Sequence, residues 1–226
     1  MNNLEAGIVC VSQAPRIPMW LKVLYTAFVC VLVPVYWRDY GPTNFLYFCD
    51  VAVFFTLAAV WTESSLLVSM PAVGILGPQL LWMVDFLGGC VGLSLTGMTA
   101  YMFDEQIPFF TRGLSFFHFW LPILIVWLVW RLGYDRRAFR NWAGLATGLM
   151  LICYFAMPAP PGPKENPNLP VNINYVYGLK SDGPQEWLPQ GAYLGLMLAG
   201  MPLLIYWPTH CLLQKFFRQH RPADSQ

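Results

Sequence analysis

Three acidic or basic side chains and one thiol fall inside apolar stretches of this chain, where a polar group is costly. Cys49 and Asp50 are adjacent, Asp85 lies in the next apolar stretch, and His118 lies near the head of the one after that. In a cysteine–histidine pair, the imidazole takes the thiol proton and the thiolate attacks an acyl carbon. Asp50 or Asp85 would orient the imidazole and fix its tautomer. The residue types therefore suggest acyl transfer to water or to a lipid hydroxyl.

Such a reaction also needs donors for the oxyanion that forms on the acyl group. The side-chain amides of Asn44, Asn172 and Asn174 are the candidates, and Tyr175 joins them as a substrate-contacting residue. A zinc site is disfavoured because the chain has 3 His, of which His220 lies in the C-terminal tail. Neither an HExxH nor a GxSxG motif occurs. No metal and no cofactor is predicted.

Each of these residues also has a purely structural interpretation. A single intramembrane histidine such as His118 is more often a hydrogen-bonded core residue than a catalyst, and a buried Cys49 would usually act as a small hydrophobic residue. Asp50 or Asp85 would then bond a polar side chain on a neighbouring helix. A proton relay through Asp85 is a further alternative.

The composition indicates which kind of fold must hold these residues. Of the 226 residues, 57% are hydrophobic and 11% are charged, whereas soluble domains carry about 25% charged residues. The formal net charge of +1 gives no basic surface for a polyanion, so nucleic-acid binding is excluded. Aromatic residues make up 16% of the chain, which suits a protein that meets two membrane–water interfaces. The sequence predicts an integral membrane protein.

Apolar stretches of about 20 residues are expected to span the bilayer as helices. We predict six such spans: Trp20–Trp37, Phe45–Trp61, Leu66–Leu93, Leu114–Leu132, Trp142–Met157 and Gly191–Leu213. The third contains Pro71 and Pro78, and we expect it to be tilted, kinked at Pro78 or continued toward Met102.

The distribution of Lys and Arg predicts the orientation of the spans. On the side predicted to be cytoplasmic lie nine of the 13 basic residues: Arg16, Lys22, Arg131, Arg136, Arg137, Arg140, Lys215, Arg218 and Arg221. On the other side lie Arg38, Arg112, Lys164 and Lys180. Both termini are therefore predicted to be cytoplasmic, and we interpret the Asp135–Arg137 turn as an anchor rather than a binding site.

With this orientation, the chemically capable residues share one layer of the membrane. The second and fourth spans enter from the outer side, which places Cys49 and His118 roughly 6–8 Å inside at 1.5 Å per residue. The third span runs outward and brings Asp85 to the same half. The long outer loop, with Asn172 and Asn174, closes over that face. This shared depth favours one site in the outer half of the membrane.

Several short motifs resemble one known family in the same order along the chain. Phe45–Asp50, with the sequence FLYFCD, is similar to the Cys–Asp stretch of YwaF-type integral membrane proteins. Ala72–Gln79 followed by Asp85 resembles that family's glycine-rich third span. Ser115–His118 and Asn172–Tyr175 resemble two further segments, and Gly183–Pro184 followed by Trp187 resembles a third.

The resemblance covers roughly residues 44–208 and implies a function. Eukaryotic relatives of this family include an acyltransferase that remodels ether phospholipids, and more distant multi-span proteins hydrolyse fatty-acid esters. By this likeness Cys49 matches the nucleophile position and His118 the base.

We therefore expect an all-α, polytopic transmembrane bundle of about six helices. A cytoplasmic tail over 1–18 precedes the helical domain over 19–213, which includes the outer loop 158–190, and a cytoplasmic tail over 214–226 follows. The expected activity is lipid acyl transfer or acyl-ester hydrolysis, with membrane lipids as partners and a bacterial inner membrane as the location. A homodimer is allowed. The alternatives are a small proton-coupled carrier that uses Asp85 and His118, and a non-catalytic membrane scaffold.

Overall fold

The computed structural model describes residues 16–93, 95–162, 169–179 and 183–217. These described parts of the chain are helical with no β-strand, as the sequence predicts. The α-helices are α1 (Met19–Tyr40), α2 (Phe48–Thr62), α3 (Ser65–Cys90), α4 (Phe109–Leu114), α5 (Phe117–Leu132), α6 (Ala138–Ala156), α7 (Gln190–Gly200) and α8 (Trp207–Phe216). Short 3-10 helices cover Pro42–Leu46, Ala100–Phe103 and Ile173–Tyr175, and a π-helical segment, Met201–Tyr206, joins α7 to α8.

Four helical segments are long and apolar enough to cross a membrane: Met19–Tyr40, Ser65–Cys90, Phe109–Leu132 and Gln190–Phe216. The helix α2 is apolar but shorter, with 15 residues. Each of these segments overlaps a span expected from the sequence, and α6 overlaps the remaining one. The chain thus has the helices of a membrane protein.

The helix boundaries differ from the expected spans in two places. The segment expected to begin at Leu114 is divided, because α4 ends at Leu114 and α5 begins at Phe117. The helix α6 starts at Ala138, before the expected Trp142, so its first turn contains Arg140. Long basic side chains are tolerated at such helix ends because they reach outward to the polar interface.

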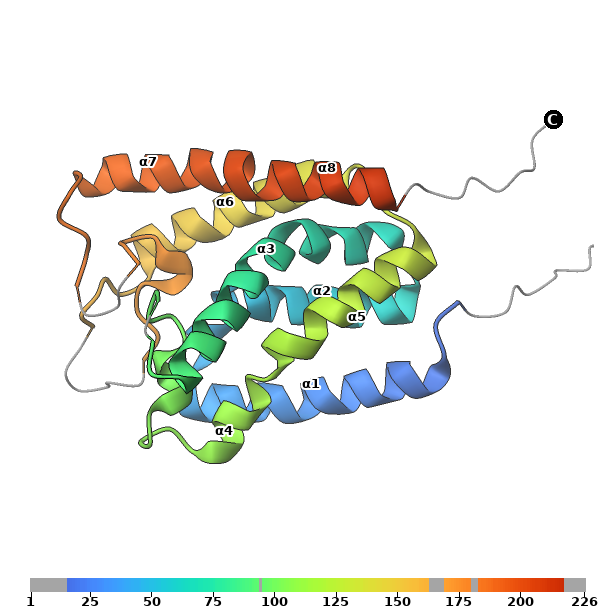
Figure 1. Cartoon of the computed structure of the whole chain (residues 1–226), viewed down its shortest axis with the longest axis horizontal. Coiled ribbons are helices and arrows are strands. Elements are labelled where there is room, and N and C mark those ends of the chain that lie inside the picture. Colours follow the sequence, from blue (N-terminus) through green and yellow to red (C-terminus); the bar gives the residue numbers. More distant parts are fainter. Residues whose placement is uncertain (1–15, 94, 163–168, 180–182, 218–226) are drawn as a thin grey trace, which may run out of the picture.

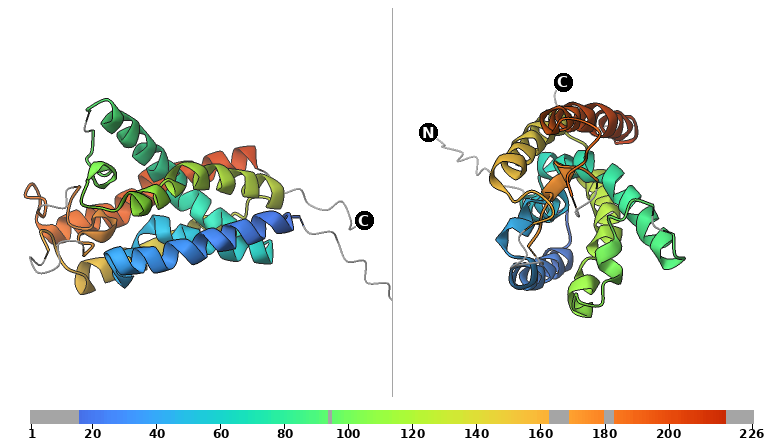
Figure 2. Two further views of the ribbon diagram at one scale, coloured as in Figure 1. Left: turned by 90° about the horizontal axis from the view of Figure 1, so that it is seen from below. Right: turned by 90° about the vertical axis from the view of Figure 1, so that its left-hand side faces the viewer.

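The helix α3 occupies the middle of the bundle and packs against α2, α5 and α6 (Figure 1). Its helical assignment continues through Pro71 and Pro78 and ends at Cys90, so it is not extended toward Met102. Figure 2 shows the C-terminal part of α3 leaning away from the other helices. There Leu80, Val84 and Leu87 are exposed, which suits contact with lipid chains.

The contact between α3 and α6 depends on a glycine. A Cβ atom at Gly74 would overlap the indole of Trp142, and that indole is fully buried. Only glycine leaves room for the ring at this position. The glycines at the end of α3 have another role, because a Cβ atom at Gly89 would meet the ring of Phe103 in the following loop rather than a neighbouring helix.

Ion pairs fix the chain at the end of the bundle where α1 begins. Lys22 Nζ lies 2.8 Å from Glu63 Oε1, and Glu63 ends α2 in a left-handed conformation with φ 52°. In the connection between α5 and α6, Arg137 Nη2 lies 2.7 Å from Asp135 Oδ2. The Arg137 guanidinium holds the pKa of Asp135 below its ordinary value, so this pair stays charged near neutral pH.

Four of the basic residues used to predict the orientation, Lys164, Lys180, Arg218 and Arg221, lie outside the described residues.

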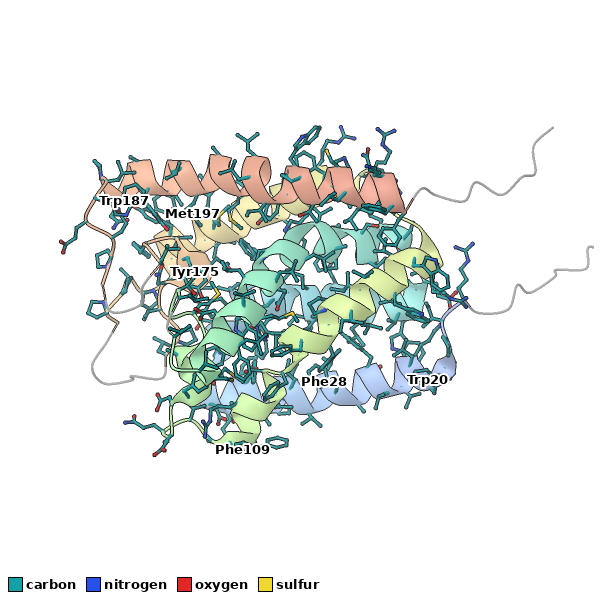
Figure 3. All side chains as sticks on the ribbon, in the orientation of Figure 1. Trp20, Phe28, Phe109, Tyr175, Trp187 and Met197 are labelled. Atoms are coloured by element: carbon teal, nitrogen blue, oxygen red, sulfur yellow. The ribbon has the colours of Figure 1, made fainter. Side chains whose placement is uncertain are left out.

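Tryptophans mark both ends of the bundle (Figure 3). Trp20 at the start of α1 and Trp187 before α7 lie at opposite ends, and both are mostly exposed. Such aromatic residues are favoured at the two membrane–water interfaces. Tyr175, labelled in the same view, lies toward the end that carries Trp187.

Candidate functional site

The helix α2 begins with the residues that the sequence singled out as chemically capable. Cys49 and Asp50 are the second and third residues of this helix, directly after the 3-10 turn Pro42–Leu46 and Tyr47. A carboxylate in the first turn is favoured because the unpaired N–H groups there carry partial positive charge. Asp50 is only 2% exposed, so the hydrogen-bond partners of its carboxyl group must come from neighbouring protein groups.

Asn44 and Cys49 share one oxygen of the Asp50 carboxyl group. The amide of Asn44 donates to Asp50 Oδ2 over 3.1 Å, and the Cys49 thiol lies 4.0 Å from the same oxygen. The other oxygen, Oδ1, is buried and has no hydrogen-bond partner among the described residues. Because a buried polar atom without a partner costs free energy, this oxygen needs an explanation.

Three tyrosines lie close enough to Asp50 for its charge to act on their hydroxyl groups: Tyr36, Tyr40 and Tyr47. Tyr36 belongs to α1, and its hydroxyl lies 2.7 Å from Ser115 Oγ. Ser115 stands between α4 and α5, three residues before His118. Tyr36 therefore links the surroundings of Asp50 to the residues just before α5.

His118 is held from two sides at the start of α5. Its Nδ1 lies 2.8 Å from the carbonyl oxygen of Ser115, and its ring stacks on Trp82 of α3 at 4.5 Å between centroids. A carbonyl oxygen only accepts hydrogen bonds, so Nδ1 carries the proton. In the neutral ring Nε2 is then the basic nitrogen, and no described residue bonds to it.

Tyr101 belongs to the short 3-10 helix Ala100–Phe103 in the connection between α3 and α4. Its hydroxyl interacts with Ser115 and with Trp82, and it is close enough to Cys49 to feel its charge. Burial raises the pKa of Tyr101 well above its ordinary value, so the hydroxyl stays protonated and available as a donor. Within the described chain, no hydrogen bond joins Cys49 to His118 directly. Cys49 and His118 therefore do not form the hydrogen-bonded pair expected from the sequence.

Asp85 has a different environment from the one predicted for a catalytic residue. Its Oδ1 accepts from the backbone N–H groups of Thr96 and Gly97, and its Oδ2 accepts from the N–H and the hydroxyl of Thr99, over 2.6 to 3.3 Å. Both oxygens therefore accept hydrogen bonds from the loop that follows α3. Asp85 thus has the structural role considered as an alternative to catalysis, except that its partners lie in a loop rather than on a neighbouring helix.

The two loop asparagines also bond mainly to the protein itself. Asn174 Oδ1 accepts from Phe48 N over 2.9 Å, and its amide donates to the Leu46 carbonyl, so it caps the start of α2. Asn174 adopts φ 58°, a left-handed conformation that asparagine tolerates well. Asn172 bonds the Gly178 carbonyl and the Tyr177 N–H within its own loop. These contacts use the groups that the sequence assigned to an oxyanion.

Tyr175, between these asparagines and the helices, faces the candidate site. It lies close enough to Cys49 and to Asp85 for their charges to act on it. Burial raises the pKa of Tyr175, so this hydroxyl too remains a donor. The outer loop thus contacts the start of α2 through Asn174, and the charge of Asp85 near the end of α3 acts on Tyr175.

Sequence reasoning missed the aromatic part of this cluster. Tyr36 and Trp82 are ordinary residues of apolar helices by pattern, and Tyr101 lies in a loop without a recognisable motif. Ser115 was noted only as part of a resembling segment. The described residues contain no group of three or more side chains that are typical metal ligands.

No family model matches this chain, and no curated protein or solved structure matches it either.

Proposed function

We propose that the chain is a multi-pass protein of a bacterial inner membrane that transfers or hydrolyses lipid acyl groups. The observation that carries the proposal is the Cys49 thiol beside the buried Asp50 carboxylate, which has one oxygen free. The proposal includes six spans with both termini cytoplasmic, so that this site lies in the outer half. It also includes the resemblance to YwaF-type proteins, which rests on the short motifs alone.

The contacts favour Asp50 rather than His118 as the group that accepts the thiol proton. Asn44 holds Asp50 Oδ2 in place, and Cys49 lies against the same oxygen. The resulting thiolate would attack the carbonyl carbon of a lipid ester and form a thioester. As the carbon–oxygen bond breaks, the leaving lipid alkoxide would take the proton from Asp50. Asp50 is then a carboxylate again.

The second half of the reaction needs a base for the acceptor. Water or a lipid hydroxyl would attack the thioester carbonyl and release the Cys49 thiolate. His118 is suited to take the acceptor's proton, because its Nδ1 proton is held by Ser115 and Nε2 is the basic nitrogen. Transfer of that proton to the thiolate returns the site to its starting state.

Tyrosine hydroxyls replace the asparagine amides as oxyanion donors in this proposal. Tyr101 and Tyr175 are both close to Cys49 and both remain protonated. Asn172 and Asn174 instead hold the loop that carries Tyr175 in place. A donor aimed at the developing charge is usually the largest single contribution to acyl-transfer catalysis.

Acyl labelling of cysteine tests the proposal directly. The full chain is purified in detergent after Cys10, Cys30, Cys90 and Cys211 are replaced by serine. Of these, Cys30, Cys90 and Cys211 are exposed and would react nonspecifically. Incubation with a radiolabelled phospholipid is expected to leave hydroxylamine-sensitive label on this protein, because a thioester is cleaved by hydroxylamine. Cys49→Ser is expected to remove the label.

Cys153→Ser provides the matched control. Cys153 is also buried near this end of the bundle, but it contacts Asn174 rather than a carboxylate. The control variant should label as strongly as the parent. Equal labelling with and without Cys49, or no acylation of the parent by any phospholipid class, would contradict the proposal.

The unpartnered oxygen of Asp50 supports a second candidate, a small proton-coupled carrier. Asp85 is occupied by its loop, so this carrier would use Asp50 with His118 instead of the expected Asp85. Proteoliposomes with a trapped pH dye distinguish the two functions. A substrate-dependent proton flux that is lost in Asp50→Asn but kept in Cys49→Ser favours the carrier, whereas an enzyme gives no flux.

A further inference from the structure

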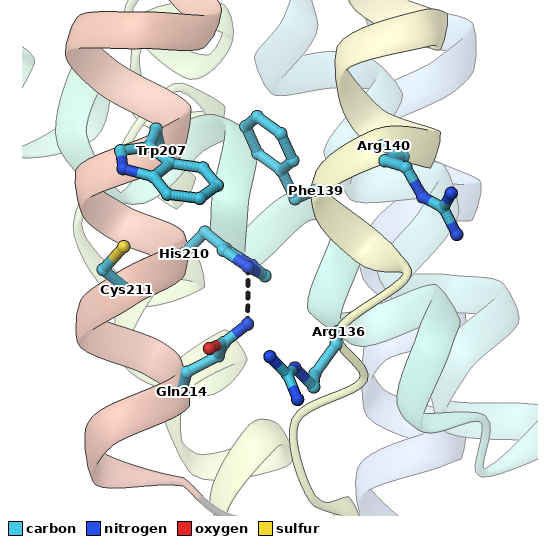
Figure 4. A pocket seen from close by; sticks show the side chains of 7 residues that line it. All are labelled: Arg136, Phe139, Arg140, Trp207, His210, Cys211 and Gln214. Atoms are coloured by element: carbon cyan, nitrogen blue, oxygen red, sulfur yellow. Dashed lines mark hydrogen bonds between the residues drawn. The ribbon is translucent and has the colours of Figure 1, made fainter.

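A pocket with polar and aromatic lining residues lies at the opposite end of the bundle from Cys49. It has a volume of about 360 Å³ and lies between the start of α6 and α8 (Figure 4). Its lining includes Arg136, Phe139, Arg140, Trp207, His210 and Gln214. The sequence suggested only an anchoring role for the turn that contains Arg136.

The pocket carries positive charge that no described acidic residue neutralises. Arg136 and Arg140 lie one helical turn apart, and neither forms an ion pair within the described chain. The neighbouring carboxylate, Asp135, is taken by Arg137. In Figure 4, Arg136 reaches toward Gln214 and His210, whereas Arg140 extends outward from the rim. An unneutralised guanidinium beside a pocket favours an anionic ligand.

The polar floor of the pocket is preorganised. His210 is 6% exposed, and its Nδ1 lies 2.5 Å from the Tyr134 hydroxyl. Its Nε2 lies 2.5 Å from Gln214 Nε2, so the amide of Gln214 is held beside Arg136. An amide NH₂ group has two hydrogens, and the second can be donated to a ligand in the pocket.

The surroundings of the pocket indicate that its ligand has an apolar part. The helical segment Gln190–Phe216 is apolar, but only 17% of its most apolar stretch is buried inside the protein. Leu203, Leu204, Leu212 and Phe216 are exposed along it. Trp207, 50% exposed, stands between this surface and the pocket, as tryptophan does at membrane interfaces. The π-helical segment Met201–Tyr206 leads directly into Trp207, and such segments occur often at functional sites.

We propose that this pocket binds the phosphate group of an anionic phospholipid from the adjoining leaflet. Arg136 and Gln214 contact the phosphate oxygens, and Arg140 closes over them from the rim. The acyl chains lie along the exposed apolar face of α8. Basic pockets between transmembrane helices bind lipid headgroups in this way. The site is independent of the chemistry proposed at Cys49.

Lipid binding to the full chain in detergent micelles tests the proposal by native mass spectrometry. Dioleoyl phosphatidylglycerol is titrated against the wild type, with dioleoyl phosphatidylcholine, whose zwitterionic headgroup has no net charge, as the comparison. We expect phosphatidylglycerol to bind more tightly, and Arg136→Gln to weaken it about tenfold because one charge-assisted contact is lost. Lys215→Gln removes the same charge from an exposed residue of α8 that does not line the pocket, and it should bind as the wild type does.

Three outcomes would overturn the proposal. Equal losses in Arg136→Gln and Lys215→Gln would show general surface attraction instead of a site. Displacement of the lipid by glycerol 3-phosphate at equal concentration would show that the pocket takes soluble phosphate compounds. Equal binding of both lipids would remove the role of charge. Arg136→Lys, which keeps the charge but loses the planar fork, should bind with intermediate strength if the protein remains folded by circular dichroism.

Discussion

Two buried aspartates with the same chemistry have opposite environments in this protein. One buried oxygen of Asp50 has no partner among the described residues, whereas both oxygens of Asp85 accept hydrogen bonds from the loop after α3. A carboxylate with all its acceptor sites occupied is stabilised as a structural group, and a partly unpaired one is suited to exchange protons. The contacts, rather than the residue type, separate these two roles.

Asp85→Asn is expected to destabilise the fold without removing chemistry at Cys49. The amide would place an NH₂ group against backbone N–H donors and lose charge-assisted hydrogen bonds, at a cost of about 1.5–3 kcal/mol. A protein of this size loses about 2–4 °C in Tm for each kcal/mol, so thermal unfolding in detergent measures the effect.

Asp104→Asn is the control for Asp85→Asn, because Asp104 is exposed and accepts only a local bond from Gln106 N. Its Tm should stay near that of the wild type. An Asp85→Asn protein with unchanged Tm but no acyl labelling would show that Asp85 acts in the chemistry instead of in the loop.

The elements of the bundle are held by close approach as well as by apolar burial. The helix α3 is central, and its contact with α6 requires the absence of a side chain at Gly74, where the Trp142 indole lies. A second contact holds α2, because Asn174, in a loop far along the chain, caps the first turn of this helix. The position of Cys49 therefore depends on both contacts.

Gly74→Ala is expected to disrupt the packing of α3 on α6. The new methyl group would overlap the buried Trp142 ring, and overpacking of this kind costs about 1–3 kcal/mol. Gly148→Ala is the matched control, since nothing lies within 4 Å of the Cβ position there. That substitution should be neutral or stabilising by about 0.5–1 kcal/mol, because alanine favours helix more than glycine does.

The comparison of these two variants by thermal unfolding separates packing from helix propensity. A lower Tm in Gly74→Ala together with an equal or higher Tm in Gly148→Ala supports the close approach. Equal Tm values in both variants would mean that Trp142 moves aside at no cost.

For the whole molecule, the distribution of charge predicts how the bundle sits in a membrane. Arg131, Arg136, Arg137 and Arg140 gather around the connection between α5 and α6, and Lys22 lies at the same end near the start of α1. The Cys49 cluster lies at the opposite end. An excess of basic residues marks the cytoplasmic side.

Reporter fusions test this orientation. In a bacterial host, green fluorescent protein fused after residue 226 should fluoresce, and alkaline phosphatase at the same point should be inactive, because both results report a cytoplasmic C-terminus. Alkaline phosphatase placed within the outer loop, between residues 158 and 190, should be active. The reverse pattern would place the Cys49 cluster at the cytoplasmic face.

The sequence by itself determined the helical, membrane-embedded character of the protein. With 11% charged residues and long apolar stretches, the backbone polar groups must be satisfied internally, and helices achieve this within each segment. The same local reasoning located the helices, and it predicts a common depth for Cys49, Asp85 and the outer loop. Helix boundaries were less certain, because the ends of spans depend on turns such as Ser115–Phe116.

Only the tertiary structure decided which groups meet. The rotation of each helix and the path of each loop joined Tyr36 to Ser115, set Asn174 at the start of α2 and directed Asp85 to its own loop. The first two of these contacts join residues far apart in the chain, and the free energies of all three depend on distance and burial rather than on residue type. For that physical reason, a pattern of residues predicted the layer of the site but not its hydrogen-bond partners.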